Sequence, residues 1–185
     1  MKRVFLAISF KDNSFLTQYI NDIKANLLAE NIKWAEADNI HLTLKFFGPT
    51  SDLSLEQIKS SLDKALKSQK SFTISFNKLG VFGSRYQPRV LWMGMGQGDK
   101  LQSLEQEISQ VLAEIDISGN RQNFVPHLTI ARIKKLNSKK YFQSVVQRYK
   151  DFDSGEIAIE SIFLYQSILH KEGPEYRVLQ EYRLL

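Results

Sequence analysis

The chain has 185 residues, of which 43 % are hydrophobic and 24 % are charged, so it can bury a core as one domain or as two lobes fused without a linker. It contains no cysteine, which excludes disulfides, thiolate metal sites and cysteine nucleophiles and suits a reducing compartment. The formal net charge of +5 favours an anionic partner such as a nucleic acid or a phosphorylated metabolite, although a basic soluble protein without such a partner explains it equally well.

The apolar run near the N-terminus is short, reaches a charge at Lys11 and lacks a cleavage pattern. It is therefore typical of a strand and not of a signal peptide. No stretch approaches the roughly 18 uncharged apolar residues that a membrane-spanning helix needs. We expect a soluble cytoplasmic protein that does not associate with membranes and that acts as a monomer.

Strand-like and helix-like segments alternate along the chain, with short connections between them. Runs rich in β-branched and aromatic residues predict strands, and apolar residues three and four positions apart predict helices. The predicted elements in chain order are strand 2–10, helix 14–30 capped by Asp12 or Ser14, strand 40–47 ended by Gly48 and Pro49, helix 54–69, strand 71–79, strand 89–95, helix 99–115, strand 122–133, helix 138–150, strand 156–166 and strand 175–184.

Two pairs of predicted strands follow one another without a helix between them. The first pair is 71–79 with 89–95, and the second is 156–166 with 175–184. Such neighbours pair antiparallel, because a parallel pair needs a longer crossover connection. The sequence therefore predicts an α+β fold and not a doubly wound parallel sheet.

Two of the three histidines, His41 and His127, are each followed by Leu-Thr and then by an aliphatic residue. The two copies lie 86 residues apart, each on a predicted strand. With this composition, the chance that two of three histidines are followed by Leu-Thr is roughly one in 30,000, so the repeat is unlikely to be accidental. Its spacing is about what a duplicated half-domain would produce.

Strand geometry gives the repeat a chemical meaning. Successive side chains alternate between faces, so His41 and Thr43 share one face, about 7 Å apart, and His127 and Thr129 do the same in the second copy. Two such strands facing a common cleft would bring together a general acid, a general base and two hydroxyl donors. Phosphodiester cleavage near neutral pH requires the two imidazoles, and the hydroxyls can bind the phosphate oxygens.

Two alternatives to catalysis stay open for these motifs. A single His-Leu-Thr strand is most simply interpreted as carrying a structural histidine, and only the repetition favours catalysis. A metal site is the second alternative, since histidines two residues apart on a strand can chelate a metal. Both motifs have Thr at that position and contain no Cys, Asp or Glu, so we expect neither a bound metal nor a cofactor.

The paired motifs and the blocks around them resemble the 2H phosphoesterases. The most similar branch is that of the RNA 2′,3′-cyclic phosphodiesterases, long described as 2′-5′ RNA ligases. The resemblance covers most of the chain. Its blocks are the opening strand RVFLAI, HLTLKFFG from His41, PRVLWMG from Pro88, FVPHLTIAR from Phe124, and a tail pattern that includes Leu164, Ser167, Gly173, Pro174 and Tyr176.

The resemblance implies one bilobal α+β domain over residues 1–185, with pseudo-symmetric lobes of antiparallel sheet and flanking helices around a central cleft. It implies hydrolysis of a terminal RNA 2′,3′-cyclic phosphate to a 2′-phosphate without a metal, with RNA ends or cyclic-phosphate nucleotides as partners. In that scheme His41 is the proton donor, His127 is the proton acceptor, and Thr43 and Thr129 bind the phosphate.

Other activities remain open at this point. The same site could act on a small cyclic phosphate such as ADP-ribose 1″,2″-cyclic phosphate, or on 2′-5′-linked oligonucleotides. The reverse reaction would ligate RNA. A non-catalytic RNA-binding module is a third interpretation, which rests only on the positive charge and the aromatic residues.

Three cations near the motifs are further candidates for phosphate binding. Lys45 lies four residues after His41, so strict alternation puts it on the same face, although a solvated lysine is an equal interpretation. The family counterpart of Arg132 lies near the cleft, but strict alternation puts Arg132 on the opposite face unless a bulge intervenes. Arg85 lies in a predicted loop, where it is more simply a surface residue.

Aromatic residues flank both motifs and could stack on a nucleobase. Phe46, Phe47 and Phe124 are the candidates, although most aromatic residues beside a strand belong to the core. Trp92 is most simply a core residue. His170 lacks the Leu-Thr context and is predicted to be exposed and uninvolved.

Overall fold

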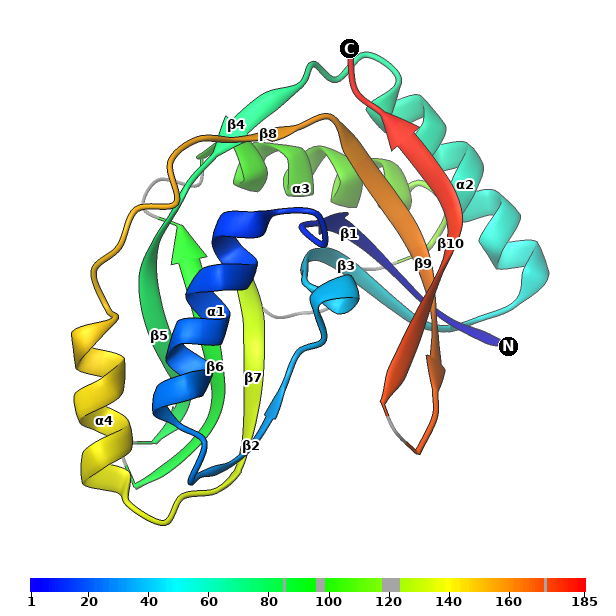
Figure 1. Ribbon diagram of the computed structural model, residues 1–185. Helices are drawn as coiled ribbons and strands as arrows, with labels where there is room; N and C mark the ends of the chain where they lie inside the picture. The colour runs from blue at the N-terminus through cyan, green and yellow to red at the C-terminus, as the bar shows by residue number, and fades with distance from the viewer. Residues whose placement is uncertain (85, 96–98, 118–123, 172) are drawn as a thin grey trace.

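The computed structural model describes residues 1–84, 86–95, 99–117, 124–171 and 173–185. These described residues form ten strands, four α-helices and one 3-10 helix, as Figure 1 shows. The elements in chain order are β1 (Lys2–Ser9), α1 (Ser14–Asn26), β2 (Asn31–Trp34), the 3-10 helix (Ala37–Asn39), β3 (His41–Thr50), α2 (Asp52–Leu66), β4 (Phe72–Ile74), β5 (Phe76–Ser84), β6 (Gln87–Met95), α3 (Asp99–Ala113), β7 (His127–Lys135), α4 (Lys139–Arg148), β8 (Ile157–Ile159), β9 (Ser161–Leu169) and β10 (Pro174–Arg183).

One large sheet holds most of the strands. Its order is β10-β9-β1-β3-β7-β6-β5, with β2 added beside β7, and all of its pairs are antiparallel. Strands β4 and β8 form a separate two-stranded sheet. The predicted α+β fold with antiparallel pairing is therefore confirmed. None of the described helices is long and apolar enough to cross a membrane.

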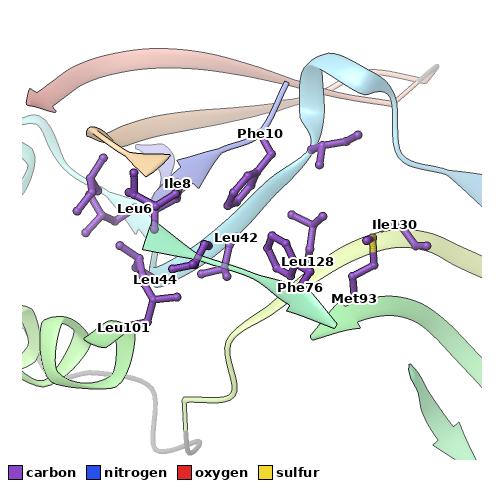
Figure 2. Close-up of a cluster of buried hydrophobic side chains, with 14 of the residues drawn as sticks. Leu6, Ile8, Phe10, Leu42, Leu44, Phe76, Met93, Leu101, Leu128 and Ile130 are labelled. Atoms are coloured by element: carbon purple, nitrogen blue, oxygen red, sulfur yellow. The ribbon is translucent and has the colours of Figure 1, made fainter. Parts of the chain in front are cut away.

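All four helices pack against the same side of the large sheet. Buried residues from each helix join those of the central strands in one hydrophobic cluster. Figure 2 shows Leu42 and Leu44 of β3 pointing into this core together with Leu128 and Ile130 of β7 and with Leu101 of α3. The other face of β1 and β9 carries a second, small cluster, which consists of Phe5, Ala7 and Tyr165.

The helices begin where short polar side chains can accept a backbone N–H. The Asn13 side chain accepts from the Leu16 amide (2.9 Å), and the Ser138 hydroxyl accepts from the Tyr141 amide (3.2 Å). In α2 the cap is Ser51, which accepts from the Ser54 amide. The predicted caps Asp12 and Ser14 of α1 were thus off by one residue, which is a common error because several adjacent residues are good caps.

The structure differs from the prediction in one longer strand, two divided strands and one additional strand. Strand 40–47 was predicted to end at Gly48 and Pro49, but β3 continues through both residues to Thr50. Strand 71–79 is divided between β4 and β5, and strand 156–166 is divided between β8 and β9, because the first part of each leaves the large sheet to pair with the other. The short strand β2 was not predicted. Its alternating polar and apolar residues span only four positions, and its pairing with β7 is a contact between distant parts of the sequence.

The first prediction concerns the core between the two motif strands. Replacing Leu128, which is fully buried, by Ala should lower the free energy of unfolding by about 3 kcal/mol, because a cavity adds to the lost hydrophobic transfer energy. Urea unfolding followed by circular dichroism measures this. The exposed Leu53 is the matched control, and Leu53→Ala should change stability by less than about 0.5 kcal/mol. Equal losses in the two variants would contradict the described core.

Candidate active site

The two motif strands meet at one pair of leucines. Strands β3 and β7 are antiparallel neighbours, with Leu42 in register with Leu128. Residues opposite one another share a face, so the residues flanking this pair point to the other face. An antiparallel register brings His41 across from Thr129 and Thr43 across from His127. In a regular ladder the two imidazoles then lie on a diagonal, with their Cβ atoms about 7–8 Å apart.

Both motif strands contain a bulge at the same place. Along β3, Thr43 pairs with Ala7 and Lys45 pairs with Leu6, so Leu44 is an extra residue. Along β7, Thr129 pairs with Trp92 and Ala131 pairs with Leu91, so Ile130 is the extra residue. A bulge of one residue shifts the alternation, so the side chains directly after it change face. A second irregularity follows in each strand, at Phe47 in β3 and at Lys134 in β7. The burial patterns of the two strands agree with this, because two consecutive residues in each are buried.

The bulge in β3 turns Lys45 away from the histidines. Its side chain is only 8 % exposed, and its ammonium group donates to the Ser109 hydroxyl (2.7 Å) and lies 3.6 Å from the Glu105 carboxylate, both on α3. The prediction that Lys45 shares a face with His41 is therefore wrong. Phe46 takes that place instead, 59 % exposed, with its ring 6.0 Å from the ring of Phe5.

The bulge in β7 has the opposite consequence for a cation. It brings Arg132, which strict alternation placed on the core side, to the face of His127 and Thr129, where it is exposed. Burial raises the pKa of the Tyr176 phenol, and the charges of Arg132 and Arg3 act against this rise. Both guanidinium groups therefore lie near this tyrosine. The bulge that Arg132 needs in order to share the face of the motif histidine is therefore present.

The two imidazoles are held in the same way. Nδ1 of His41 lies 2.7 Å from the carbonyl oxygen of Asn39, and Nδ1 of His127 lies 2.7 Å from the carbonyl oxygen of Val125. A carbonyl can only accept, so Nδ1 carries the proton in each ring. Nε2 is then left to exchange protons with a substrate, and both rings have a fixed orientation.

Aromatic rings enclose His41. The rings of Phe5 and Tyr176 each lie 5.1 Å from its imidazole, and Phe5 stacks on Tyr165 at 5.3 Å. Burial lowers the pKa of His41 below its ordinary value; the hydrogen bond to Asn39 opposes this, and the nearby His127 adds to it. That His127 contributes is consistent with both imidazoles lying in one site.

A different aromatic pair lies beside His127. The Phe82 ring lies edge-on to the imidazole at 4.9 Å and stacks on Trp92 at 5.0 Å. The Trp92 ring lies across Gly80 and Gly94, where a Cβ atom would come within 2.2 and 2.5 Å of it. Trp92 therefore lines the site, and its interpretation as a simple core residue was wrong. One feature of the sequence could have indicated this position. Gly94 lies two residues after Trp92, on the same face of the strand, and its missing side chain leaves room for the indole ring.

The remaining candidates lie elsewhere. Phe47 and Phe124 are half-buried and pack against the main core. His170 is exposed and pairs at 2.8 Å with Glu175, which lines a cavity beside His41. Arg85 lies outside the described residues.

A cavity of about 670 Å³ opens beside His41. It lies between the β9–β10 hairpin and the segment before β3, which the Asn39 side chain ties to the Pro174 carbonyl (3.0 Å). Its volume is in the range of small-molecule sites. Among the described residues, no group of three or more His, Asp or Glu side chains is arranged to hold a metal ion. The lining includes Ser9, Tyr165 and Tyr176.

The lowered pKa of His41 predicts a pH dependence of stability. Because the folded chain protonates His41 less readily than the unfolded chain does, the unfolded chain binds more protons as the pH falls below about 6.5. The stability of the wild type should therefore decrease between pH 7.5 and 5.5 relative to His41→Asn. Urea unfolding of both proteins across this range measures the difference. A difference that stays constant, or that changes in the other direction, contradicts the burial of this imidazole.

Comparisons with known proteins identify the family to which the chain belongs. The model of the 2′-5′ RNA ligase superfamily matches residues 13–169. The RNA 2′,3′-cyclic phosphodiesterase of Aquifex aeolicus is 36 % identical over 154 residues, which cover 82 % of this chain and 81 % of that protein. That of Methanocaldococcus jannaschii is 33 % identical over 180 residues, which cover 97 % and 99 %.

Solved structures share the fold. TT0787 of Thermus thermophilus superposes with a TM-score of 0.80 at 20 % identity, covering 98 % of this chain and 97 % of that one. The LigT protein of E. coli, complexed with 3′-AMP, superposes with a TM-score of 0.77 at 23 % identity, covering 99 % and 98 %. At this identity the likeness concerns the fold. On the family match and the two relatives, the chain belongs to the 2′-5′ RNA ligase superfamily.

Proposed function

We propose that this protein is an RNA 2′,3′-cyclic phosphodiesterase, which hydrolyses a terminal 2′,3′-cyclic phosphate to a 2′-phosphate. The observation that carries the proposal is the pairing of Leu42 with Leu128, which puts both His-x-Thr motifs on one face of one sheet. The names of the relatives from Aquifex aeolicus and Methanocaldococcus jannaschii support the same substrate class.

The phosphate would lie between the two imidazoles. The hydroxyls of Thr43 and Thr129, each across from the other motif's histidine, would donate to its non-bridging oxygens. Arg132, on the same face, would neutralise the negative charge that grows on these oxygens in the transition state. Phe46, exposed on that face, offers a surface on which a base can stack.

In the proposed reaction, a water oxygen attacks phosphorus while the bond from phosphorus to the 3′ oxygen breaks. His127 takes the proton of the water on Nε2, and His41 gives its Nε2 proton to the 3′ oxygen. Exchange with solvent then returns both rings to their starting states. Every proton is accounted for by the two imidazoles, so the proposed chemistry uses no metal and no cofactor.

The surroundings of His41 bear on its role as the donor. Burial lowers the pKa of His41 and so favours the neutral ring. A cyclic phosphate carries a negative charge, and an anion beside Nε2 favours the protonated ring. Substrate binding would thus supply the charged form that a donor requires, at the moment when it is needed. The assignment of donor and acceptor follows the family resemblance.

The proposal predicts the effect of removing either histidine. Turnover of cytidine 2′,3′-cyclic phosphate in the presence of EDTA should fall by at least about 100-fold in His41→Ala and in His127→Ala, because each proton transfer contributes about 10²–10⁴-fold. Lys64→Ala, at the exposed C-terminal end of α2, is the control and should retain wild-type turnover. Product analysis by chromatography should show the 2′-phosphate. Loss of wild-type turnover in EDTA, or activity that survives either histidine change, would refute the mechanism.

The two cations that follow the motifs should differ in their effect on turnover. Lys45→Met, made together with Glu105→Gln so that no buried carboxylate is left without its cation, should retain turnover within about twofold, since both side chains lie on the core side of β3. Arg132→Met should lower kcat/KM by roughly 10- to 100-fold, the usual value of a charge-assisted hydrogen bond. Steady-state kinetics on the same cyclic nucleotide measure both. A larger loss of kcat/KM for the Lys45 change than for the Arg132 change would contradict the two bulges, because it would put Lys45 and not Arg132 on the face of the histidines.

A further inference from the structure

The carbonyl group that orients His41 belongs to a residue whose side chain reaches a distant part of the sheet. The Asn39 carbonyl oxygen lies 2.7 Å from Nδ1 of His41, and the Asn39 side-chain amide donates to the Pro174 carbonyl (3.0 Å). Pro174 begins β10, 135 residues later in the chain. Asn39 therefore connects the proton donor of the proposed reaction to the β9–β10 hairpin.

The segment that supplies this carbonyl has little packing of its own. Asn39 is the last residue of the 3-10 helix, and none of the three helix residues is buried. A single 3-10 turn is held by hydrogen bonds of poorer geometry than those of an α-helix. Directly after it the backbone is anchored, because the Ile40 carbonyl accepts from the Phe10 amide (2.9 Å). The Asn39 side chain supplies a second anchor, at the residue whose carbonyl contacts His41.

The same hydrogen bond supports the end of the β9–β10 hairpin. Strand β1 pairs with β9 as far as Ser167, and β9 and β10 continue to pair with one another as far as Leu169 and Pro174. Figure 1 shows this end of the hairpin projecting away from the other strands. Tyr176 follows two residues after Pro174, and its ring lies edge-on to the His41 imidazole at 5.1 Å and 85°. Holding Pro174 thus also holds Tyr176 against the ring.

The second motif offers a comparison within the same molecule. Nδ1 of His127 lies at the same distance, 2.7 Å, from the Val125 carbonyl oxygen. The Val125 side chain is 54 % exposed and aliphatic, so it cannot donate a hydrogen bond to another segment. The two histidines therefore share the backbone contact, but only the carbonyl beside His41 belongs to a residue that a side-chain hydrogen bond fixes.

A fixed Nδ1–H bears directly on proton donation. When a doubly protonated imidazole gives up its Nε2 proton, the neutral ring that remains carries its proton on Nδ1. A hydrogen bond from Nδ1–H to the Asn39 carbonyl stabilises this tautomer and sets the direction of Nε2. A misplacement of about 1 Å in a reacting group can lower a rate by about 100-fold, so the position of the carbonyl matters to the rate.

We infer that Asn39 is a positioning residue for the proton donor. By binding the Pro174 carbonyl, its side-chain amide fixes the backbone carbonyl that orients His41. This inference rests on the proposed function, because it assigns Asn39 to the step in which His41 protonates the 3′ oxygen. Asn39 acts on the orientation of the ring and not on the affinity for the substrate.

Two changes at Asn39 test the inference through the separate effects on kcat and KM. Asn39→Ala removes the amide, and Asn39→Asp keeps its size but puts a carboxylate, which cannot donate, against the Pro174 carbonyl. Both should lower kcat for cytidine 2′,3′-cyclic phosphate roughly 10-fold and leave KM within about twofold. Because Asn39 lines the cavity, a raised KM at unchanged kcat would overturn the inference and make Asn39 a substrate-binding group.

Asn137 provides the matched control. Its side-chain amide also donates to the backbone carbonyl of a distant residue, Ala29, beyond the end of β7 that is farthest from its motif. Asn137→Ala should lower the midpoint of urea unfolding about as much as Asn39→Ala does, and it should keep the wild-type kcat. An equal loss of kcat in this control would overturn the inference in favour of a general loss of stability.

Long-range proton–nitrogen NMR of the histidine rings gives a readout that does not depend on turnover. In Asn39→Ala, the signals of neutral His41 should move from the Nδ1–H form toward a mixture of the two tautomers, and those of His127 should stay unchanged. Unchanged His41 signals, or an equal change in both rings, would overturn the inference. Absence of turnover in the wild type would instead contradict the proposed function, and the tautomers would still decide whether Asn39 orients His41.

Discussion

Leu42 and Leu128 lie opposite one another where β3 meets β7, and both side chains are fully buried. Since neighbours of a registered pair point to the other face, burying these two leucines in one core turns both histidines and both threonines to the opposite face. A slip of one residue in either strand would separate the two imidazoles onto different faces. The hydrophobic packing of one leucine pair thus positions the polar groups on which the proposed chemistry depends.

The two motifs share the same backbone geometry, but different side chains surround their histidines. Each histidine donates its Nδ1 proton to the carbonyl two residues earlier, and each strand has a bulge immediately after the Thr. The side chains around the rings differ, with Phe5 and Tyr176 against His41, and Phe82 and Trp92 against His127. An acid and a base must differ in their affinity for a proton, and unequal surroundings are how one repeated motif can provide both.

Alternation along a strand was sufficient to predict the four motif residues, because each motif ends before its bulge. Beyond the bulge the same rule failed in both copies: it placed Lys45 in the site and Arg132 outside it, and the structure shows the reverse. A bulge depends on pairing with another strand, so a single sequence does not reveal it. The register of Lys33 with Arg132 was equally hidden, because β2 is short and pairs only with a distant strand. The α+β class could be predicted from local patterns, because strands that follow one another along the chain without a helix between them pair antiparallel.

Both imidazoles should face one phosphate in the complex. Long-range proton–nitrogen NMR of the histidine side chains, during titration with cytidine 2′-phosphate, tests it most directly. The account predicts that the Nε2 signals of His41 and His127 shift with a single dissociation constant and that the pKa of each ring rises in the complex, while His170 does not respond. A response from only one of the two motif histidines, or an equal response from His170, would contradict it.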